Sequence, residues 1–585
     1  MFLQRLKEYA DRQGDLPPPY YRERPPEFLI DLDDQGKLLA AAPTDLRGSG
    51  AGVSDNLSSK RHMPYIVRRG THCKPFLLCD QADYTFGWSP SAKHLERTDK
   101  RHRHYMALLH ECLKETDAPS VRAVLCFLER APLDELEWPK DHNQAHRFAF
   151  RVDHSTWPTE QPSVQAFWAN TQVPDDAPRM QCIVCGQRQP VLRRLKNMVK
   201  GIPGASSGYA QIISANDSAY ESYGLSTSLI APICAGCAEG MTTGLGRLLS
   251  NDDTHLRMGN GVFAFWTHEE RSFNVSRMLS DPSPSDVQAL LQSVYRGESY
   301  KLETDQFYAV NLTAVKSRIQ VRQWISTTLP QVKQSLAEWF RRQAIVGPDG
   351  ETWRCLGVRH LAAATVRFQE RSGVRRSFER LRRSFDVEPE VQRQLLLAAL
   401  LNRRVSHQIL CRLLQRIRSE NNVDYFQAAL LKLTLSYQLP SSSYERGKED
   451  PMKELDLSNR EPAYLCGRLL AEIDAAQYQA LGQRNATVVD RFYGTASTAP
   501  ASVFGNLLRG TQAHLGKLRQ DKPGAYAGIQ QRLEEVMSGL EGFPRTLSLD
   551  DQALFALGYY HQRAYHRQAI TEALAAREQT SGQSG

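Results

Sequence analysis

Two stretches, QCIVCGQRQPVL at residues 181–192 and LIAPICAGCAEG at residues 229–240, each contain two cysteines separated by two residues. A turn of this length directs both sulfur atoms to one side, so each pair can chelate one tetrahedral metal ion. Four thiolates satisfy zinc and leave no open coordination position, which stabilises a fold without activating water. We therefore predict one structural zinc site, with the ligands Cys182, Cys185, Cys234 and Cys237.

Two other interpretations of the cysteine pairs stay open. The pairs could form two unconnected turns, or they could be reduced thiols packed in a core. A redox role fits less well, because neither pair follows a strand-to-helix junction of the thioredoxin type.

The chain of 585 residues is too long for a single hydrophobic core, which predicts several domains. With 41% apolar and 24% charged residues, it has the composition of a folded soluble protein. Its longest purely apolar run, residues 395–401, is far too short to span a membrane, so we expect no membrane partner. The eleven cysteines are an odd number and mostly scattered, which argues against a disulfide scaffold and predicts a cytoplasmic location.

The fold class predicted from the patterning is α+β. Residues 1–374 form a mixed N-terminal body that contains the inserted zinc-knuckle region, residues 180–240. Hairpins are expected at residues 28–41, with a turn over residues 33–36, and at residues 64–80, with a basic tip. The stretches GVFAFWT and SRIQVRQWI are predicted strands, and the second has one face formed by Arg318, Gln320 and Arg322.

The remaining residues, 375–585, are predicted to form a C-terminal helical bundle. In HQILCRLLQRI the apolar residues Leu410, Leu413, Leu414 and Ile417 recur at the spacing of one helix face. Residues 439–462 are polar and rich in helix breakers, which predicts a linker.

The 73 basic and 65 acidic residues give a net charge of +8, and several basic residues occur in clusters. The largest cluster is RFQERSGVRRSFERLRR, residues 367–383. Such segments suit a polyanion such as nucleic acid, although a solvated helix face has the same composition.

We find no catalytic signature in the sequence. The histidines of DHNQAH have helical spacing but lack the glutamate of a zinc protease, and no phosphate loop or nucleophile elbow occurs. We therefore expect a protein that is not an enzyme. A zinc-containing nuclease or nucleic-acid-modifying enzyme is one alternative, and a scaffold that holds RNA and does not contact DNA is another.

Several motifs in fixed order resemble the large-subunit family of type I-C CRISPR Cascade effector complexes. They include CIVCGQ and KGIPGASSGYAQIISANDSAYESYGLSTSLIAPIC around the cysteines, and FYAVNLTAVKSRIQVRQW at residues 307–324. The resemblance continues in LPPPYYRERPPEFLIDLDDQG, KPFLLCDQADYTFGW, YLCGRLLAEIDAAQYQALGQRN and FPRTLSLDDQALFALGYYHQR. It therefore spans most of the chain.

The resemblance implies a non-catalytic subunit of an RNA-guided surveillance complex. Such a subunit recognises a short motif that flanks the target on double-stranded DNA, helps to open the duplex and stabilises the displaced strand. Its implied partners are the Cascade backbone with its guide RNA, the RNA-processing subunits, the target DNA and a helicase-nuclease that is recruited after target binding.

Side chains that recognise a DNA sequence must be able to enter a groove, and neighbouring side chains must contact the DNA backbone. For the flanking motif, the predicted residues lie in two loops; they are Asn216, Lys74, Arg68, Arg69, Thr71, His72, Lys60, Arg61, Ser206 and Ser214. For the displaced strand, the predicted residues are arginines; they are Arg367, Arg371, Arg375, Arg376, Arg380, Arg382, Arg383, Arg403, Arg404 and Arg412.

Overall fold

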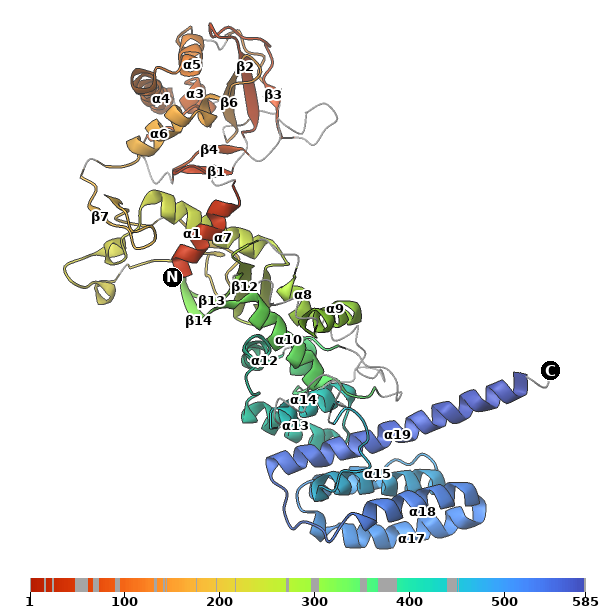
Figure 1. Ribbon diagram of the computed structural model, residues 1–585. Helices are drawn as coiled ribbons and strands as arrows, with labels where there is room; N and C mark the ends of the chain where they lie inside the picture. Colours follow the sequence, from red (N-terminus) through yellow and green to blue (C-terminus); the bar gives the residue numbers. More distant parts are fainter. Residues whose placement is uncertain are drawn as a thin grey trace. The chain divides into compact units, whose positions relative to one another are not determined.

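The computed structural model describes most of the chain, and it divides into two compact units (Figure 1). The described residues are 2–582 without 15–16, 24–25, 48–60, 67–72, 90–94, 131–133, 140–142, 144, 175, 196, 216, 270–272, 296–304, 348–354, 367–386, 439–449 and 451. The first unit comprises Met1–Ser250 and Ala314–Gln320, and the second comprises Asn251–Thr313 and Val321–Gly585. Among the described residues, no helix combines the length and hydropathy needed to cross a bilayer.

A four-stranded sheet forms the core of the first unit, with the order β3-β2-β6-β5. Its strands are β2 (Phe28–Leu32), β3 (Thr44–Asp45), β5 (Cys79–Gln81) and β6 (Arg147–Val152). Strands β2 and β6 are parallel, and the outer pairs are antiparallel. All five side chains of β2 are buried, because the strand lies in the middle of the sheet.

Helices cover this sheet, and α5 contacts both β2 and β6. They are α3 (Ala82–Thr85), α4 (Leu95–Thr116), α5 (Pro119–Glu129) and α6 (Pro162–Thr171), with the 3-10 turn η3 (Pro158–Glu160). In Figure 1, α4 and α6 lie side by side next to the sheet. The core between these layers is rich in aromatic side chains, among them Phe28, Phe127 and Trp168.

The structure confirms one predicted hairpin and corrects the other. Asp33 and Lys37 form the expected turn after β2, where the Asp33 amide donates to the Lys37 carbonyl oxygen at 2.9 Å. The hairpin predicted at residues 64–80 is wrong, because β4 (His62–Pro64) pairs with β1 (Tyr21–Glu23), whereas β5 pairs with β6. Alternating apolar residues indicated strands correctly, but pairing partners are set by contacts remote in sequence.

The rest of the first unit contains two packed helices, α1 (Phe2–Arg12) and α7 (Ala235–Ser250). Gly244 permits this close approach, since a Cβ atom there would lie 2.7 Å from the Leu6 carbonyl oxygen. The smaller elements are β7 (Arg179–Gln181), β8 (Arg188–Pro190), β9 (Val199–Lys200), β10 (Tyr209–Ala210), η4 (Ser218–Tyr220) and η5 (Thr227–Ile230). Strands β7 and β8 pair with each other, as do β9 and β10.

The second unit contains a sheet in which sequence order equals spatial order. Its strands are β11 (His255–Met258), β12 (Gly261–Thr267), β13 (Gln306–Val315) and β14 (Arg318–Thr328). Strands β12 and β14 confirm the two predicted strands. The tip of the β13–β14 hairpin, Ala314–Gln320, belongs to the first unit.

Helices make up the remainder of the second unit, as expected for the C-terminal region. They are α8 (Val275–Ser280), α9 (Pro284–Tyr295), α10 (Leu329–Gln343), α11 (Val358–Ala363), α12 (Pro389–Leu401), α13 (His407–Glu420), α14 (Tyr425–Ser436), α15 (Pro462–Leu481), α16 (Val488–Ala496), η8 (Pro500–Ser502), α17 (Phe504–Asp521), α18 (Pro523–Ser538) and α19 (Leu549–Gly582). The predicted boundary at residues 374 and 375 lies outside the described residues and stays a prediction, as does most of the predicted linker.

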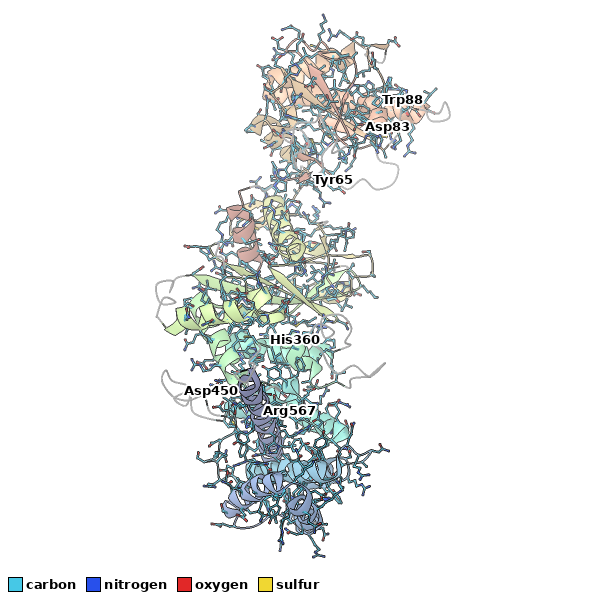
Figure 2. The ribbon with its side chains drawn as sticks, turned by 90° about the vertical axis from the view of Figure 1, so that its right-hand side faces the viewer. Tyr65, Asp83, Trp88, His360, Asp450 and Arg567 are labelled. Carbon is cyan, nitrogen blue, oxygen red and sulfur yellow. The ribbon has the colours of Figure 1, made fainter. Side chains whose placement is uncertain are left out.

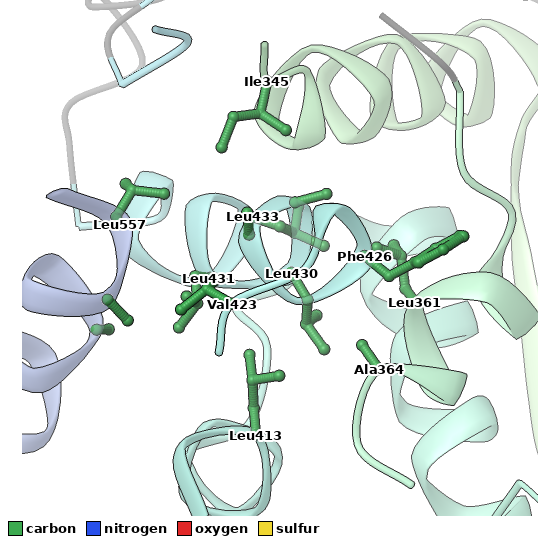
Figure 3. Packing of buried hydrophobic residues seen from close by; sticks show 14 of the residues in the cluster. Ile345, Leu361, Ala364, Leu413, Val423, Phe426, Leu430, Leu431, Leu433 and Leu557 are labelled. Carbon is green, nitrogen blue, oxygen red and sulfur yellow. The ribbon is translucent and has the colours of Figure 1, made fainter. Parts of the chain in front are cut away.

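Helix α14 is the centre of this helical region, since every one of its residues is buried. Figure 3 shows Leu430, Leu431 and Leu433 of α14 among side chains from neighbouring helices, including Leu413 of α13. The apolar stripe predicted on α13 is buried as expected. A helix that is buried on all sides packs against other elements on every face, so α14 connects the helices packed around it.

Candidate metal centre and nucleic-acid interface

The first cysteine pair lies in the loop of the β7–β8 hairpin. The Cys182 amide donates to the Gln187 carbonyl oxygen at 2.9 Å, and the Gly186 amide donates to the Cys182 carbonyl oxygen at 2.8 Å. Gly186 has a φ of +76°, which a side chain would disfavour, so the glycine allows the tight turn. This turn is the knuckle that the sequence predicts.

The second pair lies at the start of α7, where Cys234 directly precedes the helix and Cys237 is in its first turn. Two backbone hydrogen bonds connect this segment to the first knuckle and to the chain that follows β8. The Ile183 amide donates to the Pro232 carbonyl oxygen at 3.0 Å, and the Leu192 amide donates to the Ile233 carbonyl oxygen at 2.9 Å. The two pairs, almost fifty residues apart in sequence, therefore meet.

The four sulfur atoms all lie within 4.8 Å of one another. Around one zinc ion with Zn–S bonds of about 2.3 Å, tetrahedral geometry places sulfur atoms about 3.8 Å apart, so the cluster is close to a ligand set. Hydrogen bonds, first from Cys237, lower the pKa of Cys234 to about 5, and the same contact raises the pKa of Cys237. The four groups can therefore hold a metal ion, whose charge would stabilise the thiolates.

The glycine-rich signature KGIPGASSGYAQ, residues 200–211, lies between the two cysteine pairs in sequence and attaches to the tip of the β13–β14 hairpin. The Ser206 amide donates to the Lys316 carbonyl oxygen at 3.0 Å, and the Gln211 amide donates to the Ser317 carbonyl oxygen at 2.8 Å. The Ala314 amide donates in turn to the Pro203 carbonyl oxygen at 2.9 Å. Two motifs that lie about one hundred residues apart thus form one structure.

The neighbouring loop, residues 217–225, contacts the same tip. The Arg318 guanidinium carbon lies 4.6 Å from the centre of the Tyr220 ring, and the same side chain hydrogen-bonds to the Tyr220 hydroxyl. The Asp217 carboxylate caps η4 by accepting from the Ala219 amide at 3.1 Å. Beyond η4, Tyr223 is 99% exposed and has a φ of +53°, which is unusual for an aromatic residue.

We name these segments together the hairpin-tip surface. Its side chains combine aromatic rings, positive charge and a hydroxyl group; they are Lys200, Ser206, Tyr209, Tyr220, Tyr223, Lys316 and Arg318. Bases stack on exposed rings and phosphates pair with basic side chains, so this combination is typical of nucleic-acid contacts. Single exposed rings are common on protein surfaces, but three exposed tyrosine rings within fifteen residues are informative.

Of the residues predicted to read the flanking motif, Ser206 and Ser214 lie in the segment that attaches to the hairpin tip. Lys74 lies elsewhere in the first unit, where it lines a cavity of about 470 Å³. Arg61 is only 18% exposed, since it stacks 4.1 Å above the Trp157 ring and pairs with Glu160. The other predicted residues lie outside the described residues; they are Lys60, Arg68, Arg69, Thr71, His72 and Asn216.

Of the arginines predicted for the displaced strand, Arg403 and Arg404 are exposed between α12 and α13. Arg412 of α13 pairs with Glu388, and both side chains are about half exposed. The remaining seven lie outside the described residues; they are Arg367, Arg371, Arg375, Arg376, Arg380, Arg382 and Arg383. The assignment of this set stays a prediction.

The aromatic part of the hairpin-tip surface was not predicted from the sequence. Tyr209, Tyr220 and Tyr223 all lie within the quoted signature, at positions where no apolar periodicity accounts for a large ring. That mismatch is the signal that could have singled them out. Arg318, on the basic face predicted for the second strand, lies in the hairpin-tip surface, whereas Val321 of the predicted apolar face is 48% exposed.

Comparison with models of protein families gives a match over residues 3–566, to the family described as CRISPR-associated protein (Cas_Csd1). The matched range contains both cysteine pairs, the whole hairpin-tip surface and the first half of α19. No curated protein matches the chain. The resemblance to CRISPR-associated proteins is confirmed at this level, and the chain belongs to the CRISPR-associated protein family Cas_Csd1.

Proposed function

We propose that this chain is the large subunit of a type I-C Cascade complex and recognises the motif that flanks the target on double-stranded DNA. It acts without catalysis: guide RNA pairing identifies the target, and this subunit inspects the flanking duplex and helps to open it. It also stabilises the displaced strand and docks the helicase-nuclease. Family membership and the motif order support the proposal.

The observation that carries the DNA-binding role is the composition of the hairpin-tip surface. Lys316 is at the apex of the β13–β14 hairpin, and Tyr223 is at the apex of the adjacent loop, so both side chains can reach a ligand. The hydrogen bonds between residues 203–211 and the hairpin tip, together with the contact of Arg318 with Tyr220, connect the two apices in one framework. A rigid framework lowers the entropy lost when these side chains contact DNA.

We assign a structural zinc ion to the four cysteines. Zinc prefers four thiolates, and the donor set supplies them from a knuckle and a helix start. The ion would fix the β7–β8 hairpin to the start of α7. Because the glycine-rich signature lies in the chain between the two cysteine pairs, the zinc site constrains both ends of the segment that forms much of the hairpin-tip surface.

Binding of target duplexes by the assembled complex tests the function. Complexes that contain wild-type chain, Tyr223→Ala or Lys316→Glu are compared on duplexes with and without a permissive flanking motif. Loss of one stacking contact is expected to weaken binding of the permissive duplex roughly 5- to 100-fold. Tyr478→Ala and Lys37→Glu are matched controls, because they remove an exposed ring and an exposed charge from other surfaces.

Unchanged affinity and discrimination in both hairpin-tip variants would overturn the assignment of this surface. Duplex binding that does not depend on the chain at all would overturn the proposed function and favour an RNA-holding scaffold. Divalent-dependent cleavage of DNA by the purified chain would favour the nuclease alternative instead.

A further inference from the structure

A cavity of about 470 Å³ lies in the first unit, beside the metal centre. Its walls come from β1, the residues after β4 and α6, the chain after β8, and the start of α7. Ala235, which lines the cavity, lies between the ligands Cys234 and Cys237 in sequence. This volume is within the range of about 300–1,000 Å³ typical of small-ligand sites.

One wall of the cavity consists of aromatic and guanidinium groups. The Arg22 guanidinium carbon lies 4.3 Å from the centre of the Tyr65 ring, and both residues line the cavity. Figure 2 labels Tyr65. Tyr20 lines it too, with a φ of +62° that is strained for a bulky side chain. Its carbonyl oxygen accepts from the Tyr65 amide at 2.8 Å and from the Trp168 indole at 2.9 Å, which holds this conformation.

Polar groups of complementary type lie at another side of the cavity. The Asn197 side-chain amide donates to the Glu239 carboxylate at 2.6 Å. Among the described residues, no hydrogen bond is formed to the Asn197 side-chain oxygen or to the second carboxylate oxygen of Glu239. An arrangement with free acceptors and an amide donor can bind the edge of a nucleobase.

Positive charge dominates the lining of the cavity. Four of its side chains are basic and Glu239 is the acidic one among the lining residues; the basic ones are Arg22, Lys74, Arg193 and Arg194. Arg193 pairs with Asp176 at 3.1 Å, but both side chains are more than half exposed, so a phosphate can compete for the arginine. The lining therefore favours an anionic ligand that carries an aromatic ring.

We propose that this cavity takes one unstacked nucleotide of a DNA strand. The base packs against Tyr65 and the apolar lining, with its polar edge toward Asn197 and Glu239. The phosphates on either side of it pair with Arg193 and Arg194. The inference rests on the proposed function, because an opened duplex supplies nucleotides whose bases are no longer paired. Unstacking such a base costs little free energy.

Photochemical crosslinking of the full-length chain tests the proposal. The probe is a twelve-nucleotide single strand with one 5-iododeoxyuridine, and the crosslinked residues are identified by mass spectrometry. We expect adducts on Tyr65 or on the adjoining tyrosines of the cavity. Anisotropy with the same strand should show binding weakened roughly 5- to 100-fold by Tyr65→Leu, since leucine retains bulk but cannot stack.

Two further variants make the test specific. Arg22→Lys keeps the charge and loses the planar group that stacks on Tyr65, so it should also weaken binding. Tyr478→Leu, an exposed tyrosine of the second unit, should leave the affinity unchanged. Thermal unfolding of each variant should stay within a few degrees of wild type, which separates loss of binding from loss of fold.

The source of the nucleotide is distinguished by competition with free thymidine monophosphate. Competition only at concentrations far above that of the strand supports capture from a strand. If free thymidine monophosphate binds as tightly as the single strand, the proposal that the cavity takes a nucleotide of a strand is overturned. The cavity would then be assigned to a soluble nucleotide. The inference is overturned if no residue of the cavity is crosslinked and Tyr65→Leu binds the strand as tightly as wild type. In that case the proposed function is still supported if the assembled complex discriminates between duplexes with and without the flanking motif.

Discussion

The Ser206 amide donates a hydrogen bond of 3.0 Å to the Lys316 carbonyl oxygen, and so joins the glycine-rich signature to the apex of the β13–β14 hairpin. This bond fixes the position of Lys316 relative to the signature loop. Since the bond uses backbone atoms, its formation depends on how closely the two segments approach. The approach is controlled by a glycine two residues before Ser206.

Gly204→Ala should detach the signature loop from the hairpin tip. A Cβ atom at this position would collide with the Ala314 carbonyl oxygen, and the φ of +87° is itself unfavourable for alanine. We expect binding of the permissive duplex by the assembled complex to fall at least as far as in Lys316→Glu. Gly208→Ala is the matched control, because Gly208 has a similar φ of +74° but open space around it. Equal effects of the two substitutions would show that backbone strain alone matters.

Cys185→Ser should release the metal ion from the candidate centre. Removal of one of four thiolates leaves a weaker ligand set, so metal content measured by mass spectrometry should fall from about one zinc per chain to well below it. The thermal unfolding temperature should fall as well, and chelator should reproduce the effect in wild type. Cys126→Ser, which changes an exposed cysteine outside the cluster, should retain the metal. Wild-type protein without bound metal would contradict the zinc assignment.

The sequence predicted the cysteine cluster better than it predicted the hairpin-tip surface that we propose to bind DNA, and the reason is physical. Cysteine spacing is a local property, so Cys182 and Cys185 were recognisable from four residues. Tyr223 belongs to the proposed surface because its loop contacts Arg318 and its ring is exposed, and both facts depend on the folded structure. The same limit explains why the hairpin predicted at residues 64–80 is wrong. Residues 62–64 do form a strand, β4, but it pairs with β1.

Gly467→Ala should destabilise the packing of α15 against α19. A Cβ atom there would collide with the Phe555 carbonyl oxygen, and Gly558 of α19 faces the Tyr464 carbonyl oxygen in the same way. Overpacking of this kind typically costs about 1–3 kcal/mol, which chemical denaturation can measure. Gly516→Ala on α17 is the control, since nothing lies near it and alanine favours the helix by about 0.5–1 kcal/mol. An unchanged free energy of unfolding in Gly467→Ala would show that the two helices can move apart without loss of stability.

Lys432 and Asp450 form a buried ion pair that should show strong coupling. The Lys432 ammonium is fully buried, lies 2.8 Å from the Asp450 carboxylate and also donates to the Ala344 carbonyl oxygen. Burial lowers its pKa to about 8, because the charged form loses water. Lys432→Met or Asp450→Asn alone leaves one buried group unpaired and should cost about 3–5 kcal/mol. The double variant should lose less than the sum; additive losses would contradict the coupling.

His561 should make the C-terminal helices sensitive to acid. Its side chain is fully buried on α19 and shares a hydrogen bond of 3.0 Å with the Tyr464 hydroxyl. Burial lowers its pKa from 6.5 to about 3, so between these values the unfolded chain binds a proton that the folded chain does not. The free energy of unfolding should therefore fall as the pH decreases below about 6, by about 1.4 kcal/mol per pH unit from this group. His561→Gln cannot take up this proton, so its unfolding free energy should fall less steeply across the same range. Identical slopes in the two proteins, measured by denaturant titration at pH 4, 5 and 7, would show that the imidazole is accessible to protons in the folded state.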